Sequence, residues 1–232
     1  MEATHFAIAF LAGLIPALFW VWFWLREDSK RPEPYFLIAI SFIAGMAAVP
    51  IALPLQKIAI GMYAGVNVVL VWVVIEELLK YAVALALVFW NREVDEPIDM
   101  VIYMIVVALG FAALENALFV FNPLAAGDYL GSALTGGFRF LGATLLHVLA
   151  SGTVGVCLAL AYYKSKTTQV FAGTAGLFIA IVLHALFNFF IMDASGKTIL
   201  AVFLFVWMGI ILLFLLFEKV KELEYKHRYK QA

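Results

Sequence analysis

The chain has 232 residues, of which 66% are apolar and only 13% are charged. A water-soluble domain carries about 25% charged residues, and here the apolar residues come in blocks of about 20, the length that spans a hydrocarbon core of about 30 Å. A formal net charge of -1 leaves no basic surface for nucleic acid, and the single Cys157 excludes a disulfide framework or a thiolate metal site. The sequence therefore predicts an all-α, polytopic membrane protein.

Charge clusters and turn residues divide the chain into seven expected spans. In chain order they cover residues 6–25, 35–53, 66–90, 98–121, 138–163, 169–192 and 198–217. Pro50 and Pro54 are expected to kink or end the second span, which makes residues 56–65 an interfacial or re-entrant piece. Residues 122–137 form the longest expected loop. We expect one integral membrane domain over residues 1–232, with its motif-bearing core at about 66–192.

Lysine and arginine are unevenly shared between alternate sides of these spans. One side receives eleven of them: Arg26, Lys30, Arg31, Arg92, Lys164, Lys166, Lys219, Lys221, Lys226, Arg228 and Lys230. The other side receives Lys57, Arg139 and Lys197. Because cytoplasmic loops are enriched in positive residues, we expect the C-terminus in the cytoplasm and the N-terminus outside.

Four charged side chains lie well inside the expected spans: Glu76, Glu77, Lys80 and Glu115. Each costs about 2.5–3.5 kcal/mol at a helix centre on insertion scales. The polar residues His147, His184 and Asn188 lie inside spans as well. Charged groups inside a membrane are retained at such a cost mainly where they have a function, so these residues are the candidate site.

The depths of the candidate residues point to one shared site. Glu76, Glu115, His147 and His184 come from four different spans, yet all lie roughly 9 to 15 Å from the outer boundary at 1.5 Å per residue. Helical spacing places Lys80 on one face with Glu76 and Glu77, and Asn188 on one face with His184. Asn116 lies about 100° around the helix from Glu115, so we expect it to support a neighbouring helix.

Three carboxylates against one lysine leave an excess of negative charge in a poorly solvated place. A proton kept on one carboxylate, a charged histidine or a bound cation would relieve this excess. A proton-sharing carboxylate suits general acid-base catalysis, whereas two imidazoles and a carboxylate suit a catalytic zinc ion.

Four motifs together resemble the PrsW family of membrane proteases, distant relatives of the CAAX prenyl endopeptidases and the Abi proteins. The motifs are Glu-Glu-Leu-Leu-Lys at 76–80, Phe-Ala-Ala-Leu-Glu-Asn at 111–116, the segment from Arg139 to His147, and His-Ala-Leu-Phe-Asn at 184–188. Glu115 stands where the CAAX branch has histidine, and Lys80 where that branch has an arginine one residue later. Both differences fit the PrsW branch and argue against a prenylated substrate.

The resemblance implies an endopeptidase of the cell membrane that makes the first, extracytoplasmic cut in a single-span anti-sigma factor. It also implies that a glutamate activates water while histidine and asparagine stabilise the oxyanion, although a metal-dependent mechanism has been assigned too. The expected partners are thus a membrane-anchored protein substrate and the lipid bilayer, without nucleic acid.

We assign the catalytic roles accordingly. Glu76 or Glu77 is the general base, Glu115 or His147 polarises it, and His184 with Asn188 binds the oxyanion; Lys80, Asn116 and Arg139 give structural and electrostatic support. No metal is favoured on sequence grounds, because Asn188 is a poor zinc ligand and a good oxyanion donor. If the enzyme is a metalloprotease, the zinc ligands come from His147, His184, Glu76 and Glu115.

Other functions fit the sequence less well. A proton- or ion-coupled transporter would use the same buried carboxylates and histidines, but toward the cytoplasm little beyond Tyr81 and Tyr103 continues a polar path. A serine protease would need Ser151 with His184, which leaves the three glutamates unexplained. A structural or chaperone-like partner would not need so many ionisable groups.

Overall fold

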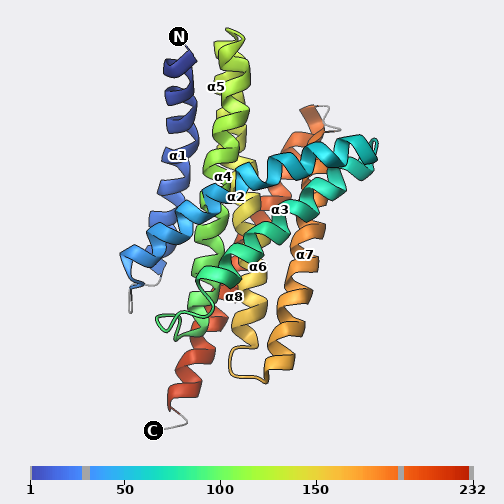
Figure 1. Ribbon diagram of the computed structural model, residues 1–232. Helices are drawn as coiled ribbons and strands as arrows, with labels where there is room; N and C mark the ends of the chain where they lie inside the picture. Colours follow the sequence, from blue (N-terminus) through green and yellow to red (C-terminus); the bar gives the residue numbers. More distant parts are fainter. Residues whose placement is uncertain (1, 28–31, 193–195, 230–232) are drawn as a thin grey trace.

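The computed structural model describes residues 2–27, 32–192 and 196–229, and within these ranges the regular structure is helical. The segments are α1 (Glu2–Glu27), α2 (Tyr35–Met62), α3 (Val66–Leu87), α4 (Pro97–Ala125), α5 (Tyr129–Phe138), the π-helical η1 (Arg139–Ala143), α6 (Thr144–Leu160), α7 (Lys166–Met192) and α8 (Gly196–Tyr229). They form one bundle (Figure 1). The helical, membrane-embedded class expected from composition is confirmed.

Helix α4 is the central element of the bundle. It packs against α1, α2, α3, α6 and α8, and 89% of its most apolar stretch is buried. Its apolar residues Ile102, Ile105 and Leu109 belong to the main hydrophobic core. Because α4 is apolar on all sides, it fits the middle of a bundle, where every face of a helix is covered.

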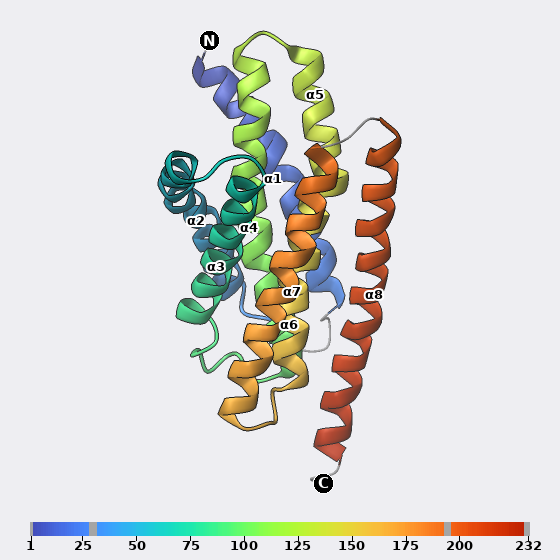
Figure 2. The same ribbon diagram turned by 90° about the vertical axis from the view of Figure 1, so that its right-hand side faces the viewer.

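The α2–α3 hairpin crosses α4 obliquely, as Figures 1 and 2 show. Glycines allow this close crossing: a Cβ on Gly45 of α2 would lie 2.1 Å from the carbonyl oxygen of Val107, and one on Gly110 of α4 would lie 2.0 Å from that of Phe42. Small residues let membrane helices approach to backbone contact.

The expected end of the second span near Pro54 is wrong. Helix α2 runs through Pro50 and Pro54 to Met62, so residues 56–62 continue the helix rather than forming a separate interfacial or re-entrant piece. A proline removes one backbone hydrogen bond, but a broken helix in hydrocarbon leaves many more polar groups without partners. Continuing the helix is therefore the less costly arrangement.

The long loop expected at residues 122–137 is also wrong. Helix α4 continues to Ala125, and α5 begins at Tyr129 after a short turn in which Gly127 has φ 81°. The Asp128 side chain caps α5 by accepting a hydrogen bond from the Gly131 amide at 2.8 Å. Helix α5 leads through η1 into α6, so the fifth apolar stretch starts at Tyr129 instead of residue 138.

Within the described residues, six helical stretches are long and apolar enough to cross a membrane, namely α1, α2, α4, the α5–α6 unit, α7 and α8. Helix α3 has 22 residues, which is about 33 Å of helix, but it carries three charged side chains at Glu76, Glu77 and Lys80. The seventh span expected from the sequence thus stays a prediction for α3.

The connections after α3, α4 and α6 lie toward the two ends of the bundle (Figure 1). Those after α3 and α6 lie toward the end where α8 finishes, and the turn after α4 lies at the end where α1 begins. The side that the sequence analysis found rich in lysine and arginine is the end where α8 finishes. Three residues of that count lie outside the described residues, namely Lys30, Arg31 and Lys230. The orientation of the two ends across the membrane remains a prediction.

Candidate active site

The motif residues of α3, α4, η1, α6 and α7 meet in one buried polar cluster. Glu76 is 5% exposed, Glu77 1%, His147 1% and His184 3%, and Lys80 is fully buried. Glu115 and Arg139 are each 17% exposed and form its most open part. The structure thus brings together residues that the depth argument assigned to one layer.

Helix α3 presents its charged residues through its regular period. Glu77 and Lys80 are three residues apart and Glu76 and Lys80 are four apart, so all three point toward the bundle interior. Leu78 between them is 46% exposed on the opposite side. The apolar outer face lets the helix keep its charged face away from lipid.

One carboxylate oxygen of Glu77 contacts two basic side chains of the cluster. Its Oε1 accepts a hydrogen bond from Lys80 Nζ at 2.5 Å and lies 2.7 Å from His184 Nδ1. An ionised carboxylate can only accept, so His184 carries its proton on Nδ1 and leaves Nε2 with a free lone pair. Glu77 therefore fixes the tautomer and the direction of His184.

Both ring nitrogens of His147 have hydrogen-bond partners. Lys80 Nζ lies 3.0 Å from Nδ1, and Glu115 Oε2 lies 3.1 Å from Nε2. Because an ammonium group can only donate, this arrangement puts the His147 proton on Nε2, from which it donates to Glu115. The rings of His147 and His184 meet edge to face with centroids 5.1 Å apart.

Arg139 connects Glu115 to the neighbouring helix. Its guanidinium pairs with Glu115 Oε2, donates from Nε to Asn116 Oδ1 at 2.5 Å and lies 3.9 Å from the ring centre of Phe119. Asn116 in turn donates to Thr144 Oγ1 at 2.8 Å. Asn116 thus contacts both Arg139 and α6, and its supporting role stays a prediction. The π-helical η1, which begins at Arg139, is a segment type found often at functional sites.

Glu76 differs from the other two carboxylates of the cluster because one of its oxygens is fully buried without a hydrogen bond. Gln56 Nε2 of α2 donates to Glu76 Oε1 at 2.8 Å, and Trp72 Nε1 donates to the Gln56 carbonyl at 3.1 Å. The second oxygen, Oε2, is buried without a hydrogen bond. Sequence reasoning missed Gln56; the available signal was a lone amide two residues beyond Pro54 in an apolar stretch.

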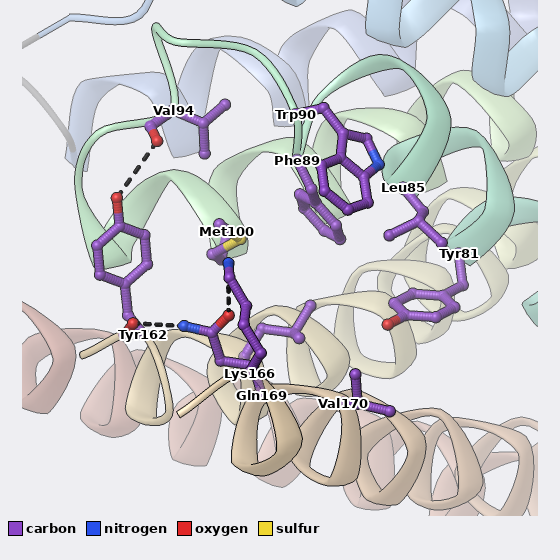
Figure 3. A pocket seen from close by; sticks show the side chains of 11 residues that line it. Tyr81, Leu85, Phe89, Trp90, Val94, Met100, Tyr162, Lys166, Gln169 and Val170 are labelled. Atoms are coloured by element: carbon purple, nitrogen blue, oxygen red, sulfur yellow. Dashed lines mark hydrogen bonds between the residues drawn. The ribbon is translucent and has the colours of Figure 1, made fainter. Parts of the chain in front are cut away.

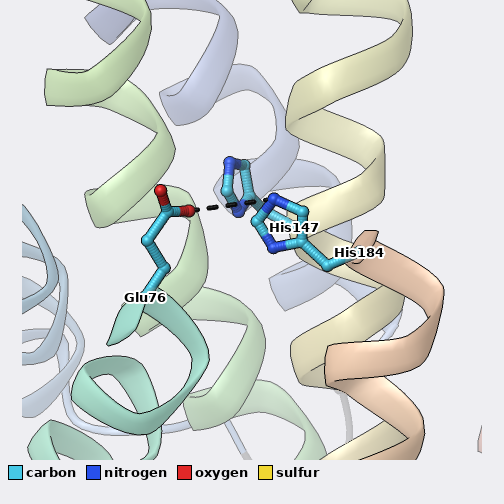
Figure 4. A group of neighbouring side chains, drawn as sticks. All are labelled: Glu76, His147 and His184. Atoms are coloured by element: carbon cyan, nitrogen blue, oxygen red, sulfur yellow. Dashed lines mark ion pairs between the residues drawn. The ribbon is translucent and has the colours of Figure 1, made fainter. Parts of the chain in front are cut away.

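Glu76, His147 and His184 form a possible metal-binding group, shown in Figure 4, with one ligand atom from each within 4.8 Å of the others. Glu76 Oε2 and His184 Nε2 lie 3.8 Å apart, close to the roughly 3.3 Å between two donors of a tetrahedral zinc ion with bonds of about 2.0 Å.

The chemistry of these donors also fits zinc. Lys80 pairs with Glu77 and Arg139 with Glu115, whereas the basic side chain nearest Glu76 Oε2 among the printed ion pairs is the imidazole of His184. One carboxylate and two imidazoles are a common zinc ligand set. Binding through His147 would replace its hydrogen bond to Lys80 or to Glu115.

Two candidate residues are not joined to this network. Asn188 follows His184 by one helical turn and is partly exposed, but the described residues record no hydrogen bond to its side chain. Ser151 Oγ is buried without a hydrogen-bond partner, so the Ser151–His184 pair that a serine mechanism needs is not formed.

A bundle of apolar helices enclosing carboxylates and imidazoles has the groups that a membrane-embedded hydrolytic enzyme needs. Residues 33–216 match the family described as PrsW family intramembrane metalloprotease. The chain belongs to this family, which confirms the resemblance drawn from the four motifs, and it is a multi-pass membrane peptidase.

Curated relatives agree with this assignment. Proteins named Protease PrsW from Oceanobacillus iheyensis, Bacillus subtilis and Clostridioides difficile are 25%, 26% and 28% identical to the chain. The matches cover 88%, 80% and 79% of this chain and 92%, 83% and 79% of the relatives. No solved structure is significantly similar.

Proposed function

We propose that this peptidase cleaves a single-span, membrane-anchored protein of the anti-sigma-factor type near its extracytoplasmic end, in the cell membrane. The buried Glu76–His147–His184 group carries the proposal, because it offers an unpartnered carboxylate oxygen beside two oriented imidazoles. The substrate class is the one that the resemblance to the family implies.

The position of the site within its helices supports the extracytoplasmic side. Glu115 and His184 lie in the C-terminal halves of α4 and α7, nearer the end of the bundle opposite the lysine-rich connections. Their partner His147 lies near the middle of the α5–α6 unit. Glu115 and Arg139 are the most exposed members of the cluster, and Arg139 is the first residue of η1.

Each residue has a distinct task in the proposed reaction. Glu76 Oε2 is the atom that activates the nucleophilic water, because it is the buried carboxylate oxygen of the cluster without a hydrogen bond. Glu77 orients His184 through Nδ1, and Lys80 holds both Glu77 and His147. The partly exposed Asn188 amide is the donor that faces the substrate carbonyl, whereas His184 Nε2, which carries a lone pair in this tautomer, lies beside Glu76.

Glu76, His147 and His184 would hold a zinc ion, which when bound would activate water and polarise the scissile carbonyl as a Lewis acid. The family description as a metalloprotease and the Glu76–His147–His184 donor group support this more strongly than the metal-independent route favoured from sequence. In either chemistry Glu76 is the indispensable carboxylate.

Replacing the carboxylate tests the proposal. We expect Glu76→Gln to abolish cleavage of a reconstituted single-span substrate, because the amide keeps the volume but neither accepts a proton nor ligates zinc well. Glu93→Gln, an exposed acid outside the cluster, is the matched control. Cleavage by Glu76→Gln at the rate of the control would refute the assignment.

Metal content gives a second readout that does not depend on turnover. We expect purified protein to contain close to one zinc per chain, and His184→Ala and Glu76→Gln to lose it. Active protein that lacks zinc and withstands prolonged dialysis against a chelator would instead establish the metal-independent glutamate route.

A further inference from the structure

A cavity lies at the lysine-rich end of the bundle, apart from the proposed catalytic residues. It has a volume of about 440 Å³ and is formed by the ends of α3, α4, α6 and α7, a size within the roughly 300–1,000 Å³ of small-molecule sites. Figure 3 shows Tyr81 and Leu85 at one end of it, and Tyr162 with Val94 at the other.

The walls of this cavity are mainly apolar and aromatic, and part of the wall is also exposed. Phe89, Met100 and Leu158 lie among the lining residues, while Trp90 is 78% exposed and Val170 68%. Val170 lies on α7, which is long and apolar enough to cross a membrane, and Trp90 lies in the turn after α3, so the cavity opens where lipid chains can reach it.

Lys166 is the single charged side chain among the eleven lining residues. Its Nζ donates to Gln169 Oε1 at 3.1 Å, and Gln169 Nε2 donates to the Tyr162 carbonyl at 2.6 Å (Figure 3). An ammonium group has three donors, so Lys166 keeps donors for an anion. The acidic residues Glu93, Asp95 and Glu96 of the neighbouring connection do not line the cavity.

We propose that this cavity binds one anionic phospholipid of the leaflet at the lysine-rich end, with an acyl chain between α3 and α7 and its phosphate at Lys166. Basic pockets between membrane helices on the cytoplasmic side bind anionic headgroups in this way. The exposed Trp90 and the partly exposed Tyr162 suit the level of the headgroups, where aromatic residues collect. The lipid would touch the two helices that supply Glu77 and His184.

Two pairs of variants test the site. Lys166→Gln removes the charge in the cavity, whereas Lys164→Gln removes an exposed lysine that does not line it. Leu85→Trp fills the space between α3 and α7, whereas Leu87→Trp places the same side chain outside the cavity; Leu85 is 39% and Leu87 42% exposed. Both members of each pair start from similarly exposed positions, so effects on folding are matched.

The probe is a phosphatidylglycerol with a photoreactive group in its acyl chain, added to phosphatidylcholine vesicles that hold the full-length protein. Crosslinked peptides are mapped by mass spectrometry. We expect labels near residues 85–90 and 166–170, a loss of about fivefold in Lys166→Gln, and a loss to background in Leu85→Trp. The two control variants should label like the wild type.

Three outcomes would overturn the proposal. Equal labelling by a photoreactive phosphatidylcholine, unchanged in Lys166→Gln, would mean a site without selectivity for anionic lipid. Full competition by glycerol phosphate would mean a site for a free phosphate group. Labels mapped away from the cavity, with the wild-type yield in Leu85→Trp, would place the lipid elsewhere. Because none of these measurements uses cleavage, they are independent of the proposed peptidase mechanism.

Discussion

The two histidines of the site are oriented by oppositely charged neighbours. Lys80 is a donor to His147 Nδ1, whereas Glu77 is an acceptor for His184 Nδ1. The two rings consequently hold their protons on different nitrogens, Nε2 in His147 and Nδ1 in His184. His184 therefore directs the lone pair of its Nε2 at Glu76, whereas His147 donates from its Nε2 to Glu115.

Gln56 gives a prediction at the same scale. Its side-chain amide fixes Glu76 Oε1, so Gln56→Ala leaves Glu76 in place but free to rotate. We expect kcat to fall about tenfold, equivalent to the loss of one hydrogen bond of about 1.4 kcal/mol, with little change in KM. Steady-state cleavage kinetics measure this effect.

Lys57→Ala is the matched control, because Lys57 is the exposed neighbour of Gln56 on α2. Wild-type kcat in Gln56→Ala would mean that Glu76 keeps its orientation without Gln56.

At the scale of the helix, hydropathy predicted where the elements lie but not where they end. The rule that proline ends a helix failed at Pro50 and Pro54, because hydrocarbon penalises an open helix end more than a missing amide. As a consequence Gln56 was placed in an interfacial or re-entrant piece outside the second span and was missed as a partner of Glu76. The glycines of residues 122–137 similarly suggested a loop, although Asp128 caps a new helix there.

The α2–α4 crossing gives the prediction at this scale. A Cβ on Gly45 would lie 2.1 Å from a backbone oxygen of α4, so Gly45→Ala must push the two helices apart. We expect a loss of about 1–3 kcal/mol in the free energy of unfolding. Thermal unfolding in detergent micelles is the measurement.

Gly61→Ala is the control, because Gly61 lies on the same helix and a Cβ there meets nothing within 4 Å. If Gly45→Ala unfolds at the same temperature as Gly61→Ala, the crossing is looser than the structure indicates.

For the whole molecule, the sequence was most informative about the residues that are energetically unusual in a membrane. The buried charges Glu76, Glu77, Lys80 and Glu115 were found because apolar surroundings make them conspicuous, and helical spacing with depth predicted that they meet. Partners such as Gln56 and Thr144 are ordinary residues whose importance depends on tertiary contacts. The catalytic roles and the substrate stay predictions.

The pH dependence of folding gives the last prediction, from a group outside the spans. Glu33 precedes α2 and is 9% exposed, and its Oε2 accepts a hydrogen bond from Tyr103 of α4 at 2.5 Å. Burial raises the pKa of Glu33 above its ordinary value, and the nearby Asp95 and Glu96 raise it further, while hydrogen bonds from Tyr103 and Asp99 oppose the shift. The folded state therefore binds the Glu33 proton more tightly than the unfolded state.

The sign follows from this difference. Between the ordinary pKa of a glutamate, about 4.3, and the raised pKa of the folded state, the native protein binds more protons, so its free energy of unfolding decreases as the pH rises. Glu33→Gln keeps an oxygen for Tyr103 but has no proton to lose. We expect the wild type to lose more stability than Glu33→Gln between pH 4.5 and pH 7, as measured by thermal unfolding in micelles at a series of pH values. An identical pH slope in the two proteins would show that the carboxyl group of Glu33 does not resist ionisation in the folded state.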